Sequence, residues 1–240
     1  MSQIGKVFGV AAAVMTLGSV ASADSITMTY LGFGASQTAG ISYNASRSWD
    51  GRSVSSFTNI TAGAHRFGVY SQERVTFCAQ LFEGVTVGNT YTFDYTDVAN
   101  VPDSPPAPGA MGAIKATLVS DLYRRYYSGL STAQDNAAFQ IALYEITHEN
   151  LSAADAASAL AQLDLTRGAF QTSASAEAFQ SAADMLASLG EGGFKSVGNN
   201  LRGLTNATAQ DQLLMVPVGG PAILAGLGLL GVGVLRRRMK

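Results

Sequence analysis

The chain has 240 residues, of which 47% are hydrophobic and 13% are charged, and its formal net charge is −2. This composition excludes a disordered, solvating chain, and the length suffices for a substantial hydrophobic core. Five of the 15 basic residues lie near the two ends, so the stretch from Asp24 to Asp211 holds 10 basic against 17 acidic residues. An acidic body of this kind argues against nucleic acid as a partner, because nucleic-acid binders normally present a basic surface.

The first 23 residues have the layout of a secretory signal peptide. Lys6 supplies the positive charge, an apolar run extends from Val7 to Val14, and the small residues Ala21-Ser22-Ala23 form an A-x-A cleavage site. We therefore expect residues 1–23 to be removed on export. The alternative, a short buried helix, leaves the small-residue ending unexplained.

Residues 213–240 are predicted to form a sorting signal and a transmembrane anchor with a basic tail. The stretch from Leu213 to Leu235 carries no charge, its continuous helix candidate is 222–235, and four basic residues follow. About 20 apolar residues span a bilayer, and basic residues after them keep the tail inside and the body outside. The predicted protein is thus exported and contacts the membrane through its C-terminal helix.

This tail contains the motif Val216-Pro217-Val218-Gly219-Gly220-Pro221, then the apolar glycine-rich helix, then the terminal arginines. In this layout it resembles the PEP-CTERM sorting signal of Gram-negative bacteria, with Val218 in place of the acidic residue between the prolines. The resemblance implies processing by an exosortase-like enzyme and display at the cell surface or in the extracellular matrix. A permanent single-span anchor is the alternative.

Residues 24–212 are expected to form one α+β ectodomain, with a β-rich sheet or barrel over 24–100 and a helical section over 110–205. Thr, Val, Tyr and Phe dominate the first part, and Gly and Asn interrupt it, as is typical of strands and turns. The predicted strands are Ser25–Leu31, Val54–Ile60, Arg66–Tyr70, Arg74–Phe82 and Thr90–Thr96. A proline-rich loop over 101–109 ends this β section.

After this loop, apolar residues recur at helical spacing. Helices are expected over 112–128, from Ser131 through His148, from Ser152 to about Leu163, and from Ser173 or Ser175 to Gly190. Residues 192–206 are expected to be irregular, and Gln212–Val216 to form a last strand. We expect His148 to be exposed at its helix end, and no metal site, because His65 and His148 lack metal-binding spacing.

Cys78 is the single cysteine, so no intramolecular disulfide can form. An odd cysteine in an exported protein indicates intermolecular pairing or a reactive thiol. On its predicted strand, Cys78 shares a face with Thr76 and Gln80, and Phe77 lies on the other face. The alternative is an inert, half-buried thiol.

Gln140 interrupts the most apolar stretch of the predicted helices. Residues 137–144 are otherwise all apolar or aromatic, which predicts a helix that is buried on every side. A buried carboxamide needs partners, because leaving one unpaired costs roughly 1–3 kcal/mol. Gln140 either bonds to neighbouring backbone or has Cys78 as its partner.

The motifs Phe77-Cys78, Tyr91-Thr92-Phe93 and Ala138-Phe139-Gln140-Ile141-Ala142-Leu143-Tyr144 are similar to those of internal-thioester domains in bacterial surface adhesins. Those domains carry a Cys on a strand and a Gln in a T-Q-x-A-I-W type helix. The resemblance implies a thioester between Cys78 and Gln140, with Tyr91, Tyr144 and Glu145 as candidate lining residues. Gln80 is the competing partner, but same-face neighbours on a strand lie roughly 6.6–6.8 Å apart.

The expected function is a single covalent capture rather than enzymatic turnover. An amine or hydroxyl of a surface or matrix partner attacks the acyl carbon of Gln140, which frees the Cys78 thiol. Formation of the thioester requires a thiolate, near-attack geometry and help for the oxyanion, and no cofactor. The alternative function is a structural envelope or matrix protein with a free cysteine and no covalent activity.

Overall fold

The computed structural model describes residues 25–216, which form an α+β structure with a large antiparallel sheet. The predicted signal peptide and most of the predicted anchor lie outside this range. The strands are β1 (Ser25–Tyr43), β2 (Thr58–Val69), β3 (Gln72–Cys78), β4 (Thr90–Thr96), β5 (Phe170–Ser173), β6 (Leu201–Thr205) and β7 (Gln212–Met215). The helices are α1 (Gly112–Tyr126), α2 (Ala133–His148), α3 (Ala156–Leu160) and α4 (Ala176–Ala187).

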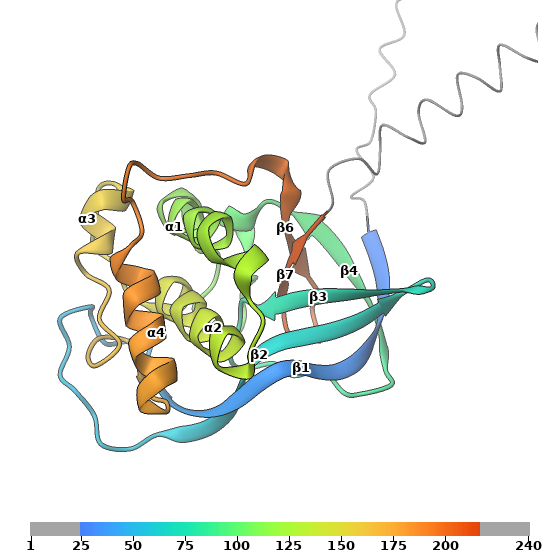
Figure 1. The fold of residues 1–240 in the computed structure, drawn as a ribbon, viewed down its shortest axis with the longest axis horizontal. Helices are drawn as coiled ribbons and strands as arrows, with labels where there is room; N and C mark the ends of the chain where they lie inside the picture. The colour runs from blue at the N-terminus through green and yellow to red at the C-terminus, as the bar shows by residue number, and fades with distance from the viewer. Residues whose placement is uncertain (1–24, 217–240) are drawn as a thin grey trace, which may run out of the picture.

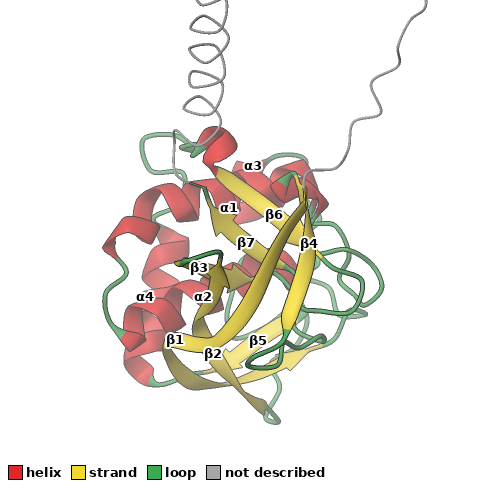
Figure 2. Ribbon diagram, turned by 90° about the vertical axis from the view of Figure 1, so that its right-hand side faces the viewer, coloured by secondary structure: helices red, strands yellow, loops and turns green. Residues whose placement is uncertain are grey.

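The sheet closes on itself because β1 pairs along both of its edges. The strand order is β2-β3-β7-β6-β4-β1-β5, and β1 additionally pairs with β2. One edge of β1 carries β2 over residues 29–41, while the other carries β4 over 25–29 and β5 over 40–43. Register shifts between Tyr30 and Ser36 mark irregularities that let this 19-residue strand bend. Figure 2 shows the strands wrapping around a common interior, the sheet or barrel that the sequence predicts.

The α-helices lie together on one side of this sheet (Figure 1). α2 is the innermost, and every residue from Asn136 to His148 is buried, as its apolar sequence predicts. Its N-terminus is set by a capping box, in which Thr132 and Asp135 bond each other's backbone N–H groups. One apolar cluster fills the space between the helices and the sheet, and a second lies inside the closed strands around Tyr30, Phe67 and Phe93.

Several predicted elements differ from the structure because tertiary pairing overrides local pattern. β5 interrupts the section expected to be helical, and β6 lies in residues 192–206, which are expected to be irregular; both strands are too short to show alternation of apolar residues. The predicted strands Val54–Ile60 and Arg66–Tyr70 both overlap one strand, β2, and residues 54–57 precede it. The expected helix from Ser152 to Leu163 is reduced to the five residues of α3.

The expectation that His148 is exposed is wrong. Its ring is fully buried against Tyr43, Tyr144 and Phe170, and its Nδ1 lies 2.7 Å from Thr147 Oγ1. The cause is tertiary, since Tyr43 of β1 and Phe170 of β5 cover the end of α2. Burial, and then the nearby Lys115, lower the pKa of His148 to about 3.

The predicted strand at Gln212–Val216 exists as β7 and pairs with β3 and β6. The first residues of the segment expected to form the anchor therefore belong to the folded body. Within residues 25–216, no helix has the length and apolar character needed to cross a membrane.

Candidate functional site

Cys78 is the last residue of β3 and is fully buried. The pairing of β2 with β3 ends at His65 and Thr76, so the edge of Cys78 that faces β2 has no strand partner. The Gln140 carboxamide, from α2, fills this gap. The Cys78 N–H donates to Gln140 Oε1 at 3.0 Å, and Gln140 Nε2 donates to the Cys78 carbonyl at 2.9 Å. The structure thus brings the two predicted residues together, through the backbone of Cys78.

This arrangement decides which residue lies beside the sulfur. In an antiparallel ladder the N–H and C=O of one residue point to the same neighbour, so Cys78 makes a non-hydrogen-bonded pair with its partner on β7. That partner is Gln212, directly opposite Cys78. Side chains of such pairs approach each other more closely than those of hydrogen-bonded pairs.

The sulfur of Cys78 contacts a ring of polar side chains. Its Sγ lies 3.0 Å from His65 Nε2 and 2.9 Å from Gln210 Oε1. Gln212 presents both atoms of its amide, with Nε2 at 3.5 Å and Oε1 at 3.8 Å. The Tyr144 hydroxyl also hydrogen bonds to the sulfur.

The two glutamines at the sulfur are oriented differently. Gln210 offers its oxygen and directs its Nε2 to the Gln80 carbonyl at 2.6 Å, which is the arrangement of a hydrogen-bond acceptor. The Gln212 carboxamide points its nitrogen and its oxygen at the sulfur in hydrogen-bonding geometry, so its carbon lies farther from the sulfur than either atom. A near-attack arrangement, with the reacting atoms about 3–3.5 Å apart, requires this carboxamide to turn.

The Gln212 carboxamide is held in this orientation by two hydrogen bonds. Thr76 Oγ1 donates to Gln212 Oε1 at 2.8 Å, and Gln212 Nε2 donates to the Gln210 carbonyl at 3.0 Å. A donor at Oε1 is placed where negative charge develops when a nucleophile adds to the amide carbon.

Burial makes the Cys78–His65 pair neutral. It raises the pKa of the Cys78 thiol to about 12 and lowers the pKa of His65 to about 4. At neutral pH the site therefore holds a thiol and an uncharged imidazole 3.0 Å apart. Burial thus disfavours both the thiolate and the imidazolium, so His65 can take the thiol proton only in concert with attack of the sulfur.

The three residues predicted to line the site lie in different surroundings. Tyr144 lies at the sulfur, whereas the Glu145 carboxylate accepts from Asp164 N–H at 2.7 Å. Tyr91 accepts from Thr86 N–H through its hydroxyl and packs beside Phe93. Among these three lining candidates, the structure therefore brings Tyr144 to the site and leaves Tyr91 and Glu145 in other contacts.

Gln80, the competing thioester partner, is also buried. Its Oε1 accepts from the Asp211 N–H at 3.2 Å. It therefore orders the chain segment that carries Gln210 and Gln212.

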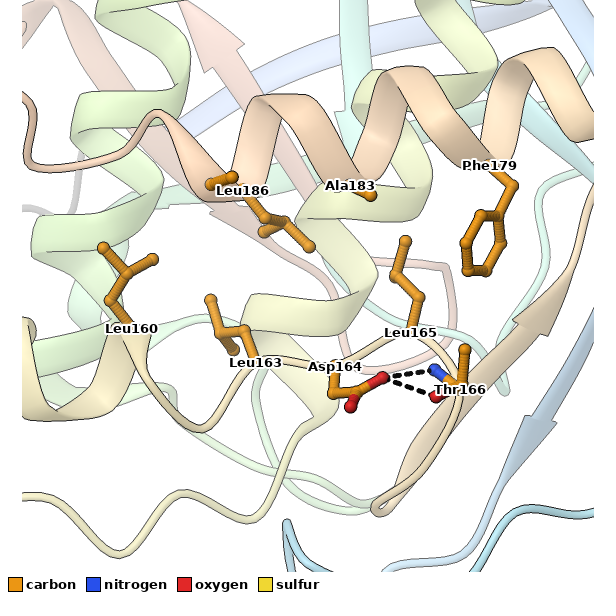
Figure 3. A pocket seen from close by; sticks show the side chains of 9 residues that line it. Leu160, Leu163, Asp164, Leu165, Thr166, Phe179, Ala183 and Leu186 are labelled. Atoms are coloured by element: carbon orange, nitrogen blue, oxygen red, sulfur yellow. Dashed lines mark hydrogen bonds between the residues drawn. The ribbon is translucent and has the colours of Figure 1, made fainter.

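A cavity of about 250 Å³ lies beside the side chains that contact the Cys78 sulfur. His65, Tyr144 and Gln210 line it together with residues of β1, β2 and the loop after β3. A second cavity of about 280 Å³ lies between α4 and the segment after α3 (Figure 3). Its walls are mostly leucine and phenylalanine. Its two polar side chains, Asp164 and Thr166, hydrogen bond to each other, so they are not free to act on a ligand.

Sequence reasoning missed four side chains of this site: His65, Thr76, Gln210 and Gln212. The sequence points to His65 only as a candidate metal ligand, and to Thr76 only as a neighbour of Cys78 on its strand. The signal for the glutamines is the segment Ala209-Gln210-Asp211-Gln212 at the start of the predicted last strand. Without the register between β3 and β7, nothing in the sequence shows that this segment faces Cys78.

In the part of the chain that the structure describes, no group of three or more His, Cys, Asp or Glu side chains is arranged to hold a metal ion. Comparison of the chain with models of protein families, with curated proteins and with solved structures finds no match.

Proposed function

We propose that Cys78 forms an internal thioester and that this exported surface or matrix protein uses it to capture a nucleophile covalently. The observation that carries this proposal is the buried contact of one sulfur with two carboxamides and an uncharged imidazole. The signal peptide and sorting tail that support export are proposals from the sequence, since they lie outside the described residues.

The geometry favours Gln212 as the acyl donor. Its carboxamide faces the sulfur with both terminal atoms and has a hydroxyl donor on its oxygen, and attack requires the carboxamide to turn so that its carbon faces the sulfur. The Gln140 carboxamide, which the adhesin resemblance implies as the donor, has its oxygen and nitrogen bonded to the Cys78 backbone. Gln140 is then the residue that positions Cys78, and a Cys78–Gln140 thioester requires both of these hydrogen bonds to break.

Formation of the bond is balanced without a cofactor. The thiol proton passes to His65 Nε2 as Sγ attacks the Gln212 carboxamide carbon, and the Thr76 hydroxyl hydrogen bonds to the oxyanion. The proton then moves to the departing nitrogen, and ammonia leaves. One S–C bond forms and one C–N bond breaks. The buried position of Cys78 keeps water from hydrolysing the product.

Capture of a partner breaks the thioester again. An amine or hydroxyl of a partner adds to the thioester carbon, a stable amide or ester forms, and Cys78 leaves as a thiol. Because the ammonia is gone, the site does not regenerate itself. The protein therefore reacts once, as a covalent adhesin does, and is not an enzyme.

A structural protein with a free thiol is the alternative function. It would have to bury His65, Gln140, Gln210 and Gln212 around one sulfur, although buried polar groups usually cost stability relative to apolar ones. This concentration of buried polar side chains at one sulfur favours the reactive site.

Intact mass of the purified protein tests the proposal. Thioester formation lowers the mass by about 17 Da, the mass of the ammonia released. We expect this loss in the wild type and its absence in Cys78→Ser and Gln212→Glu, whose side chains cannot form the bond. In Gln140→Glu we expect the loss in a smaller fraction of molecules, because a carboxylate replaces the amide that donates to the Cys78 carbonyl. Gln134→Glu, on the same helix as Gln140, is the matched control. Each mass is compared with the value calculated for that variant.

Two outcomes contradict parts of this proposal. A wild type at full mass, with one titratable thiol after denaturation, rejects the thioester altogether. Loss of the mass change in Gln140→Glu together with its retention in Gln212→Glu assigns the acyl group to Gln140.

A further inference from the structure

The hairpin between β2 and β3 carries an aromatic side chain that the fold does not use. Tyr70 and Ser71 connect the two strands, since Val69 pairs with Gln72. The Tyr70 side chain is fully exposed. Its φ is 54°, and Tyr70 is the one residue other than glycine with a positive φ in the part of the chain that the structure describes. Tight hairpin turns favour Asn, Asp or Gly at such positions, so neither packing nor turn geometry explains this tyrosine.

The described chain ends beside this hairpin. Leu214 pairs with Thr76 in the antiparallel register of β7 and β3, so Val216 lies level with Arg74. Val216 and Arg74 accordingly line the same surface pocket. From this level the hairpin extends four more residues to Tyr70, a distance of roughly 13 Å. Figure 1 shows the hairpin projecting on the side of the molecule where β7 ends.

The other end of the described chain lies at the same end of the barrel. Thr29 of β1 pairs with Gly68 of β2, and because the strands are antiparallel, the residues of β1 before Thr29 run toward the hairpin. The predicted signal peptide and the predicted anchor, which lie outside the described residues, therefore both connect to the body beside the β2–β3 hairpin.

The sequence leaves a short distance between the body and the predicted anchor. The helix candidate of the anchor begins at Ala222, six residues after Val216. A chain spans at most about 3.3–3.6 Å per residue, so Val216 lies within roughly 22 Å of the apolar segment. The hairpin tip extends roughly 13 Å past Val216, which brings Tyr70 within reach of the headgroup layer of a bilayer that holds this segment.

The side chains of the hairpin suit a lipid surface. Tyrosine is enriched at membrane–water interfaces, where its ring lies at the level of the headgroups. Glu73 is the one acidic residue of β2 and β3, and it pairs with Arg66 at 3.5 Å. Arg74 then leaves the hairpin with a net positive charge, which anionic lipid headgroups attract.

We infer that Tyr70 and the β2–β3 hairpin contact the headgroups of the membrane that holds the predicted anchor, and that this contact orients the body. The inference rests on the export and anchoring in the proposed function and is independent of the thioester. Cys78 lies at the other end of β3, six residues or roughly 20 Å from Gln72. This orientation therefore turns the end of β3 that carries the reactive site away from the lipid surface.

Fluorescence of a single tryptophan tests this contact. The full chain is reconstituted in vesicles of phosphatidylglycerol and phosphatidylcholine, in which the phosphatidylcholine is either ordinary or brominated close to the headgroup, since bromine quenches tryptophan at short range. Trp49 is the one tryptophan of the chain, so Trp49→Phe/Tyr70→Trp reports on the hairpin alone. Trp49→Phe/Phe82→Trp is the matched control, because Phe82 is exposed in the loop that follows the other end of β3.

We expect the brominated lipid to lower the fluorescence of Trp49→Phe/Tyr70→Trp roughly twofold and to leave the control unchanged, because an interfacial ring lies at headgroup level. Flotation of the vesicles shows in parallel that the chain is membrane-bound. Bound protein without quenching at position 70, or with equal quenching in both variants, would overturn the inference while the anchor stands. A chain that does not float with the vesicles would overturn the anchoring and the inference together, whereas the thioester is judged separately by intact mass.

Discussion

At the scale of single residues, the site depends on how one carboxamide replaces a missing strand. Gln140 pairs with both backbone groups of Cys78, as a neighbouring strand would. That pairing leaves the Cys78 side chain next to Gln212 on the opposite edge. Pairing with the Cys78 backbone thus explains why the apolar helix contains Gln140, whether or not Gln140 also reacts.

His148 shows a second consequence of burial, which predicts a pH dependence of stability. An unfolded chain protonates a histidine near pH 6.5, whereas burial lowers the pKa of His148 in the folded protein to about 3. The neutral ring therefore contributes stability above pH 6.5, and this contribution is lost as the pH falls toward 3, by roughly 1 kcal/mol per pH unit. Between pH 7 and pH 4.5, urea unfolding should show a larger loss for the wild type than for His148→Gln. Equal losses in the two proteins would contradict the buried, neutral state of His148.

At the scale of elements, α2 connects the apolar core to the site. It packs against β1, β2 and α4 and carries both Gln140 and Tyr144 one helical turn apart. Residues one turn apart share a helix face. The same helix therefore binds the Cys78 backbone through Gln140 and the Cys78 sulfur through Tyr144. β3 and β7 provide the other half of the site through their register.

The capping box of α2 gives a prediction for this element. Thr132 Oγ1 accepts from the Asp135 N–H at 3.0 Å, and the Asp135 carboxylate accepts from the Thr132 N–H at 3.0 Å. Thr132→Ala removes the first bond and should lower the free energy of unfolding by about 1 kcal/mol. Thr117→Ala, at an exposed position within α1, is the matched control and should cost nothing. Urea denaturation measures the free energy of unfolding of both variants. An equal decrease in the two would mean that the cap adds no stability.

At the scale of the whole molecule, a Cys78–Gln212 thioester would tie two neighbouring strands of the closed sheet. The two residues are far apart in the sequence, and all of α1 to α4 and β4 to β6 lies between them. A cross-link that closes such a long loop reduces the entropy of the unfolded chain. Capture would therefore remove a bond that stabilises the fold as well as attach a partner.

This coupling is measurable by unfolding the protein before and after treatment with methylamine. In the loop-entropy model, a loop of this size contributes up to about 5 kcal/mol. We expect the treated wild type to unfold at lower urea concentration and to resemble untreated Cys78→Ser. Methylamine should leave the unfolding of Cys78→Ser unchanged. Unchanged stability of the wild type after full reaction would show that the bond does not restrain the fold.

The sequence by itself determined the class of the fold and the buried helix around Gln140, and it singled out Cys78 as the one cysteine. These conclusions depend on local composition and periodicity, which short-range physics controls. A single thiol and a glutamine in an apolar helix are visible without coordinates, and a buried amide needs partners. That Cys78 is the partner of Gln140 is implied only by the resemblance to thioester domains.

Only the tertiary structure decided which side chains reach the sulfur. His65 comes from β2, Gln210 from the segment before β7 and Gln212 from β7, and they converge on Cys78 through strand register. A shift of one residue in that register would turn each side chain to the other face of its strand, and no local pattern records the register of strands more than a hundred residues apart. The same long-range packing buries His148 and forms β5 and β6, whose short sequences carry no pattern of their own.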